Sequence, residues 1–178
     1  MSWTCDECGF DSESVGPAEA VTALRAFGRR YRAPLTRFLP GEDGDAVVRA
    51  RPAPEVWSAL EYAAHVRDVY EWYAARVERT LAEDRPVFDL LLSPDDAAVA
   101  GRYNEQDPVA VADELAANAE RLAAMFEGVP DGAWDRFGLT RGEERSVLSH
   151  ARRAVHEGNH HLLDIGRGMR AVRSAGAP

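Results

Sequence analysis

The sequence contains no lysine, one isoleucine and only two cysteines among its 178 residues. So few cysteines exclude a disulfide scaffold, and a chain of this length buries about 70% of its unfolded surface, enough for one ordinary domain. Residues with AT-rich codons are avoided, whereas alanine and arginine are abundant. This usage indicates a GC-rich bacterial genome, and we expect an actinobacterial source.

A basic surplus and a long apolar run are also missing. The chain has 21 basic and 30 acidic side chains and a formal net charge of -9, which argues against nucleic acid or an anionic membrane as its partner. No apolar run approaches the roughly 20 residues of a membrane span. Residues 1–16 have neither the basic start nor the apolar stretch of a signal peptide. We therefore expect a cytoplasmic protein.

Four segments show the apolar periodicity of amphipathic helices, and none of the intervening segments is predicted to form strands. The helices are expected to start at Pro17, Ser58, Asp107 and near Ser146, with a capping box formed by Ser58 and Glu61. This pattern predicts an all-α fold, a four-helix bundle of residues 17–173 that follows a cysteine-containing tail of residues 1–16. The connections 40–56, 84–107 and 128–144 are long, so we expect at least one to cross over the bundle.

The five histidines all lie in predicted helices. His65 is in the second helix, and the fourth helix carries His150, His156, His160 and His161. At 100° per residue, His156 and His160 point about 160° away from the apolar stripe of their helix, toward solvent. Glu157 and His161 lie about 100° from its centre, as His65 does in its own helix. Such border positions on two packed helices are expected to converge on one cleft.

Two imidazoles and one carboxylate are a typical ligand set for a divalent metal. We therefore predict that His65, Glu157 and His161 bind zinc, or alternatively nickel or ferrous iron, with positions left open for water or substrate. From periodicity alone, His65 could equally be a hydrogen-bonded core histidine and Glu157 a solvated helix residue. His150, on the same border, is a candidate proton shuttle with a core position as its alternative.

The tail carries a second candidate site. Cys5 and Cys8 have the Cys-x-x-Cys spacing of half a zinc knuckle, and His156 and His160 have the spacing of the helical half of a Cys2His2 set. Together they could bind a structural zinc that fastens the tail to the fourth helix. There are two alternatives. The tail could carry two free thiols without a role, or the two cysteines could form a redox pair.

Two segments, WSALEYAAHVRD and HEGNHHLLDI, resemble the DinB/YfiT-like superfamily of metal-binding four-helix bundles. In that superfamily a histidine of the second helix joins two ligands spaced four residues apart in the last helix. The resemblance thus implies His65, Glu157 and His161 as metal ligands. With a glutamate at position 157, the implied ligand set resembles that of the mycothiol-dependent maleylpyruvate isomerases. Those enzymes carry a further C-terminal domain, which has no counterpart in this chain.

A metal with an open position can hold a low-molecular-weight thiol as its thiolate, which then attacks an electrophile. We therefore expect a metal-dependent thiol S-transferase or isomerase that acts on a small electrophile, with mycothiol as the co-substrate. The alternatives are a non-catalytic, stress-associated metal-binding bundle and a metal-dependent hydrolase. The expected partners are the thiol and the electrophile, together with a second copy of the chain in a homodimer.

Overall fold

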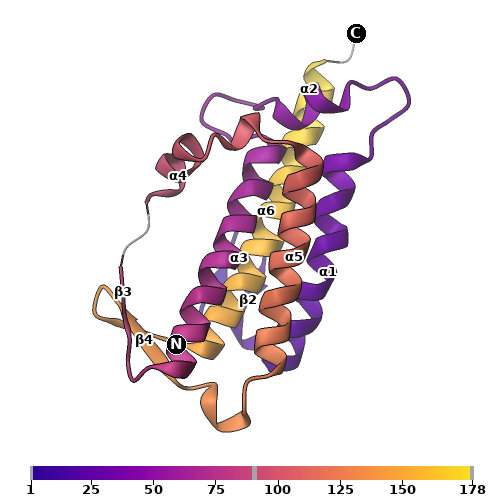
Figure 1. Cartoon of the computed structure of the whole chain (residues 1–178). Coiled ribbons are helices and arrows are strands. Elements are labelled where there is room, and N and C mark those ends of the chain that lie inside the picture. The colour runs from indigo at the N-terminus through magenta and orange to yellow at the C-terminus, as the bar shows by residue number, and fades with distance from the viewer. Residues whose placement is uncertain (1, 90–91, 177–178) are drawn as a thin grey trace.

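The computed structural model describes residues 2–89 and 92–176, and four long helices form its body (Figure 1). These helices are α1 (Pro17–Thr36), α3 (Ala59–Ala82), α5 (Pro108–Glu127) and α6 (Val147–Ala175). The side chains of Ser58, Asp107 and Ser146 cap the last three, as the sequence predicts. The prediction of an all-α four-helix bundle is confirmed.

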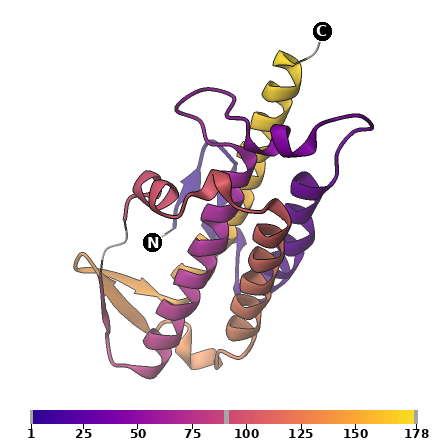
Figure 2. The same ribbon diagram turned by 45° about the horizontal axis from the view of Figure 1, so that its top comes forward.

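The order of the helices around the bundle differs from their order in the chain. Both α1 and α3 pack mainly against α5 and α6, so α1 and α3 lie at opposite corners. Helices α1 and α6 run toward one end of the bundle, whereas α3 and α5 run toward the other (Figures 1 and 2). The connection between the parallel helices α3 and α5 must therefore return along the bundle, which confirms the predicted crossover.

Short elements occupy the connections. The first contains α2 (Gly44–Arg49), and the crossover contains β3 (Val87–Phe88), α4 (Pro94–Ala100) and the 3-10 turn η2 (Tyr103–Glu105). The third contains the 3-10 turn η3 (Asp131–Ala133) and the strands β4 (Phe137–Thr140) and β5 (Glu143–Ser146). Ahead of α1 are β1 (Thr4–Cys5), β2 (Phe10–Asp11) and the 3-10 turn η1 (Ser12–Ser14).

The expectation that no strands lie between the helices was wrong. Strand β4 pairs with β3 in parallel and with β5 in an antiparallel hairpin, and β1 pairs with β2 ahead of the bundle. Each strand has only two to four residues, too few to show an alternating pattern. Arg141 and Gly142 form the two-residue turn of the β4–β5 hairpin, and both have the left-handed φ angles (54° and 78°) that such a turn requires.

The start of α3 is held by a network of polar and aromatic contacts. The Ser58 hydroxyl accepts a hydrogen bond from the Glu61 backbone, and the Glu61 carboxylate accepts one from the Ser58 backbone at 2.8 Å. Arg51 also donates to the buried Glu61 carboxylate. Ahead of the cap, the Trp57 ring packs against Tyr62 with a centroid separation of 5.5 Å. These contacts hold the first turns of α3, which carry His65.

Gly158 lies where α6 packs against Phe27 of α1 and Tyr70 of α3. A Cβ atom at this position would be 2.2 Å from the Tyr70 hydroxyl and 2.6 Å from the Phe27 ring. The Tyr31 hydroxyl donates a hydrogen bond to the Gly158 carbonyl at 2.9 Å. Because only glycine fits here, the helical turn that contains Glu157 is held at a defined distance from α3.

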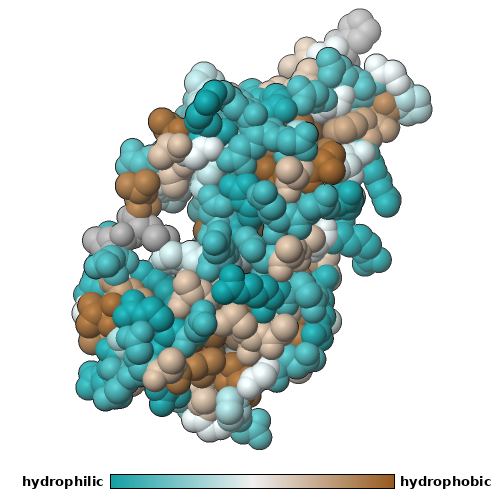
Figure 3. Space-filling model, in the orientation of Figure 1, coloured by the Kyte–Doolittle hydropathy of each residue, from teal (hydrophilic) through white to brown (hydrophobic). Residues whose placement is uncertain are grey.

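The exterior is polar. Hydrophilic residues cover most of the face in Figure 3, in keeping with the charged composition. Within residues 2–89 and 92–176, no helix is both long and apolar enough to cross a membrane.

Candidate metal centre

His65 of α3 and Glu157 and His161 of α6 come together at one edge of the bundle. The Glu157 Oε2 atom lies 3.5 Å from His65 Nε2 and 3.3 Å from His161 Nε2. One donor atom from each of the three residues lies within 4.8 Å of the other two. The three residues selected by their angular positions around the helices thus lie in one cleft.

These distances are compatible with a cation shared by the three side chains. Charge-assisted hydrogen bonds between nitrogen and a carboxylate usually measure about 2.7–2.9 Å. Zinc–nitrogen and zinc–oxygen bonds of about 2.0–2.1 Å at a tetrahedral angle separate the two ligand atoms by about 3.4 Å. The nitrogen–oxygen separations of 3.3 and 3.5 Å match that spacing, so the donor set fits a divalent metal.

The two imidazoles are oriented by neighbouring side chains. His161 Nδ1 lies 3.0 Å from Asp164 Oδ2, which leaves Nε2 directed toward Glu157. The Tyr62 ring stacks on the His161 ring at 5.1 Å, and Trp57 packs edge-on against His65 at 5.4 Å. A carboxylate on the far nitrogen of a metal-binding histidine fixes its tautomer and makes it a better ligand. Asp164 is placed to do this for His161.

The electrostatics of the pair follow from burial and mutual contact. Burial lowers the pKa of His161, but its contacts with Asp164 and Glu157 outweigh this and raise the pKa to about 9. Burial raises the pKa of Glu157, yet the two histidines bring it well below its ordinary value. Without a metal, His161 is therefore protonated at neutral pH. A cation bound there must displace that proton.

The candidate ligands line a cleft of about 420 Å³. Aromatic and acidic side chains dominate its wall, which comprises Glu55, Trp57, Tyr62, His65, Val69, Trp72, Tyr73, Pro94, Asp95, Glu157 and His161. The Trp57 indole donates to Asp95 Oδ1 at 3.1 Å, joining the wall at α4 to the start of α3. Within the described part of the chain, no arginine lines this cleft.

His150 is not among these lining residues. Its side chain is 1% exposed and packs against Tyr73 at 5.5 Å. Burial, together with the positive charges of Arg76, Arg153 and Arg145, lowers its pKa to about 3. The imidazole is therefore neutral and enclosed in the core at neutral pH, and the structure does not bring it to the cleft.

The second candidate set, Cys5, Cys8, His156 and His160, also comes together. The prediction that His156 and His160 point into solvent was wrong, because the β1–β2 hairpin covers them and leaves their side chains 18–19% exposed. Trp3 and Phe10 pack against His156 at 4.8 and 5.3 Å. The angular positions of His156 and His160 correctly place them outside the bundle core. They do not indicate that the N-terminal hairpin covers the two side chains.

Several residues of the cleft escaped the sequence reasoning. Trp57 and Tyr62 were detectable as neighbours of the capping box, but their contacts with His65 and His161 depend on how α3 packs against α6. Glu55 and Asp95 stand in or beside connections, and no periodic pattern points to them. Asp95 reaches the cleft because the crossover places α4 beside the start of α3, whereas Glu55 lies in the first connection, just ahead of α3.

The fold is similar to those of three solved structures. YfiT from Bacillus subtilis, described as a probable metal-dependent hydrolase with an unusual four-helix bundle topology, superposes with a TM-score of 0.78 at 15% identity over 93% of both chains. A mycothiol-dependent maleylpyruvate isomerase gives 0.66 at 16% identity, over 87% of this chain but 62% of the isomerase. A conserved protein from Enterococcus faecalis gives 0.65 at 14% identity, over 87% of this chain and 95% of its own.

Sequence comparison identifies the family. No curated protein matches the chain. The DinB superfamily profile, however, matches residues 23–165, which include most of the bundle and all three candidate ligands of the cleft. The chain therefore belongs to the DinB superfamily.

Proposed function

We propose that this protein is a metal-dependent enzyme that joins a low-molecular-weight thiol to a small electrophile or isomerises the electrophile through such an adduct. The observation that carries the proposal is the convergence of His65, Glu157 and His161 in a cleft large enough for a small molecule. Zinc suits two imidazoles and a carboxylate, and mycothiol is the expected thiol. The resemblance to the mycothiol-dependent isomerase supports this choice of co-substrate.

Three protein donors leave coordination positions free, which is typical of catalytic rather than structural sites. A divalent cation held there would bind a thiol and keep it as the thiolate at neutral pH. Glu157 offsets part of the positive charge, and Asp164 holds His161 in the tautomer that presents Nε2. In a transfer, the thiolate sulfur would bond to the electrophilic carbon while the leaving group departs with its bonding electron pair. In an isomerisation, the sulfur would add to a carbon–carbon double bond and displace the π electron pair onto the neighbouring atom. After rotation about the resulting single bond, that pair would re-form the double bond and expel the thiolate.

The cleft wall indicates the chemical class of the electrophile. Trp57, Tyr62 and Trp72 offer flat surfaces, and Glu55 and Asp95 add negative charge. The side chains of Arg67, Arg76 and Arg153, which could bind a substrate carboxylate, do not line the cleft. The wall therefore favours an uncharged electrophile with an apolar or aromatic part over a dianion.

The experiment is a thiol-consumption assay with the purified, metal-loaded protein and a panel of uncharged electrophiles. We expect loss of the thiol and formation of an adduct or isomer, detected by mass spectrometry, and strong loss of activity in Glu157→Gln. Glu120→Gln is the matched control, since Glu120 is exposed on α5 and pairs only with Arg25. Turnover without added thiol would replace the proposal by metal-dependent hydrolysis. Bound metal without turnover of any panel member would favour a non-catalytic metal-binding protein.

A further inference from the structure

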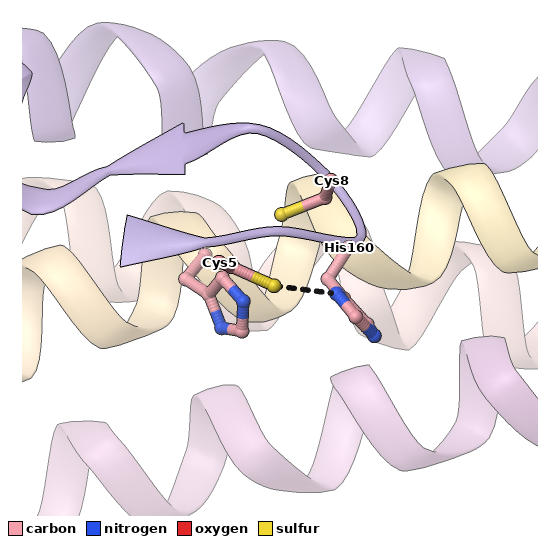
Figure 4. Close-up of side chains that lie close together, drawn as sticks. Cys5, Cys8 and His160 are labelled. Atoms are coloured by element: carbon pink, nitrogen blue, oxygen red, sulfur yellow. Dashed lines mark hydrogen bonds between the residues drawn. The ribbon is translucent and has the colours of Figure 1, made fainter. Parts of the chain in front are cut away.

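The N-terminal hairpin packs on α6 next to the face that carries Glu157 and His161. Arg167 of α6 donates a hydrogen bond to the Glu7 carbonyl at 3.0 Å, and Arg152 donates to the Val15 carbonyl at 3.0 Å. Figure 4 shows the Cys5 thiol directed toward His160, with the Cys8 thiol extending from the turn of the same hairpin. Between the hairpin and α6 lie four side chains of metal-binding types, Cys5, Cys8, His156 and His160, which the cleft chemistry does not use.

The four donors have the spacing of ligands around one ion. Donor atoms of Cys5, Cys8, His156 and His160 all lie within 4.8 Å of one another. Cys5 Sγ is 3.6 Å from His160 Nδ1. In a tetrahedral site with a zinc–sulfur bond of about 2.3 Å and a zinc–nitrogen bond of about 2.05 Å, these two atoms would be about 3.6 Å apart.

The ring nitrogens of the two histidines support the same interpretation. His156 Nε2 is buried and has no hydrogen-bond partner among the described residues. His160 directs Nδ1 toward Cys5, while its Nε2 lies 3.4 Å from Glu7 Oε2 and 3.6 Å from Asp164 Oδ2. Metal-binding histidines commonly present their second nitrogen to a carboxylate in this way. A metal ligated by His156 Nε2 would also satisfy a buried polar atom that otherwise has no partner.

The hairpin turn is shaped to present both thiols on one side. Gly9 adopts a left-handed φ of 69°, and its N–H donates to the Cys5 carbonyl at 2.8 Å. A residue with a Cβ atom would be strained in that conformation. The turn folds the four-residue Cys-x-x-Cys segment back on itself, so Cys5 and Cys8 face the same pair of histidines.

We propose that Cys5, Cys8, His156 and His160 bind a structural Zn²⁺ that fastens the N-terminal hairpin to α6. Two thiolates and two imidazoles complete a tetrahedral zinc sphere and leave no position for substrate. Donor atoms of His160, His161 and Asp164 also lie within 4.8 Å of one another. This set lacks thiolates, however, which bind zinc more strongly than carboxylates do. It would also take His161 from the cleft and His160 from the hairpin site.

A bound zinc ion would stabilise the small β1–β2 hairpin. The two strands of the hairpin have two residues each, and an isolated hairpin is at best marginally stable in water. Because a structural zinc contributes its binding free energy to folding, the ion would hold the hairpin on α6. The thiols of an alternative redox pair would explain the cysteine spacing, but not the two histidines opposite them.

The experiment is a titration of the reduced, metal-free protein with Co²⁺, followed by visible and near-ultraviolet spectroscopy. Thiolate ligands give sulfur-to-cobalt charge-transfer absorption, which the cleft donors cannot produce. We expect this absorption in the native protein and in His161→Ala. We expect it to be absent from Cys5→Ser/Cys8→Ser, together with loss of one equivalent of zinc. Native protein without the absorption, or a cysteine variant with unchanged zinc content, would overturn the proposal.

Alkylation of the native protein gives a second test that does not depend on a variant folding. Because Cys5 and Cys8 are the only cysteines, the number of labels reports on this site alone. We expect slow labelling in the zinc-loaded protein and rapid double labelling after a chelator is added. Equally rapid labelling before and after chelation would contradict zinc ligation, as would formation of a Cys5–Cys8 disulfide without release of zinc.

Discussion

The two faces of α6 carry the same spacing of side chains but lead to different sites. Glu157 and His161 face the cleft, whereas His156 and His160, each one residue earlier, face the hairpin. One residue is about 100° of rotation, so two pairs on a single helix serve two separate surfaces. His65 alone completes the cleft set, which leaves it open. Two thiols complete the hairpin set, which closes it. The partner surface, not the helical spacing, therefore decides what each pair can do.

Removing a cleft ligand should separate the two faces most clearly. In His161→Ala we expect thiol-dependent activity to fall by more than about a hundredfold, because losing a ligand costs more than the 10–100-fold effect of losing its hydrogen-bond partner. The hairpin zinc should remain, since His161 is not among its donors. Activity assays combined with metal analysis would measure this. Loss of both metals would show that the sites are not separate.

Gly158 lies between the two pairs, so a change there should affect both faces at once. In Gly158→Ala the added Cβ would meet the Tyr70 hydroxyl at 2.2 Å and the Phe27 ring at 2.6 Å. Overpacking of this kind typically costs about 1–3 kcal/mol, and we expect the upper end. Thermal unfolding checks the loss of stability. Gly132→Ala is the control, because nothing lies within 4 Å of a Cβ built there.

Asp164 lies close to a histidine of each pair, His160 and His161. In Asp164→Asn we expect metal affinity in the cleft to fall by about 10–100-fold, because His161 loses its charged partner at 3.0 Å. The hairpin site should weaken less, since Glu7 also approaches His160. Competition with a chelator, followed by the Co²⁺ spectra, measures the two affinities separately. Equal weakening at both sites would remove the distinction between them.

The stabilities of the metal-free and metal-loaded proteins should depend on pH in different ways. The folded state raises the pKa of His161 to about 9, so its stabilising contribution is complete below the unfolded value of 6.5 and is lost as pH rises toward 9. We expect the free energy of unfolding of the metal-free protein to fall by about 1.5 kcal/mol between pH 6.5 and 8. Added stability from the metal should grow over the same range, because protons compete less for His161.

Chemical denaturation with and without chelator, at several pH values, measures both trends. The matched variant is His161→Asn, in which the alkaline loss of the metal-free protein should largely disappear. A metal-free protein whose stability is flat from pH 6.5 to 9 would contradict the ion pair between His161 and its carboxylate neighbours.

Much of the bundle could be predicted because its signals are local. The Ser58 capping box, the Asp107 and Ser146 caps and the 3.6-residue stripes depend on nearby residues alone. The grouping of His65, Glu157 and His161 also followed from angles around two helices. Its role as a metal site remains a prediction.

Features that depend on distant segments could not be predicted in the same way. The hairpin over His156, the parallel pairing of β3 with β4 and the contact of Trp57 with Asp95 all join parts far apart in the chain. Helical periodicity describes the direction in which a side chain points from the axis of its helix. It does not describe which other segment will cover that residue.

The most direct test of the central claim is anomalous diffraction from crystals of the purified protein, collected on both sides of the absorption edge of the bound metal. We expect an anomalous peak within bonding distance of His65 Nε2, His161 Nε2 and the Glu157 carboxylate. Density that shows these three side chains hydrogen-bonded to one another, with no anomalous peak after zinc has been supplied, would contradict it.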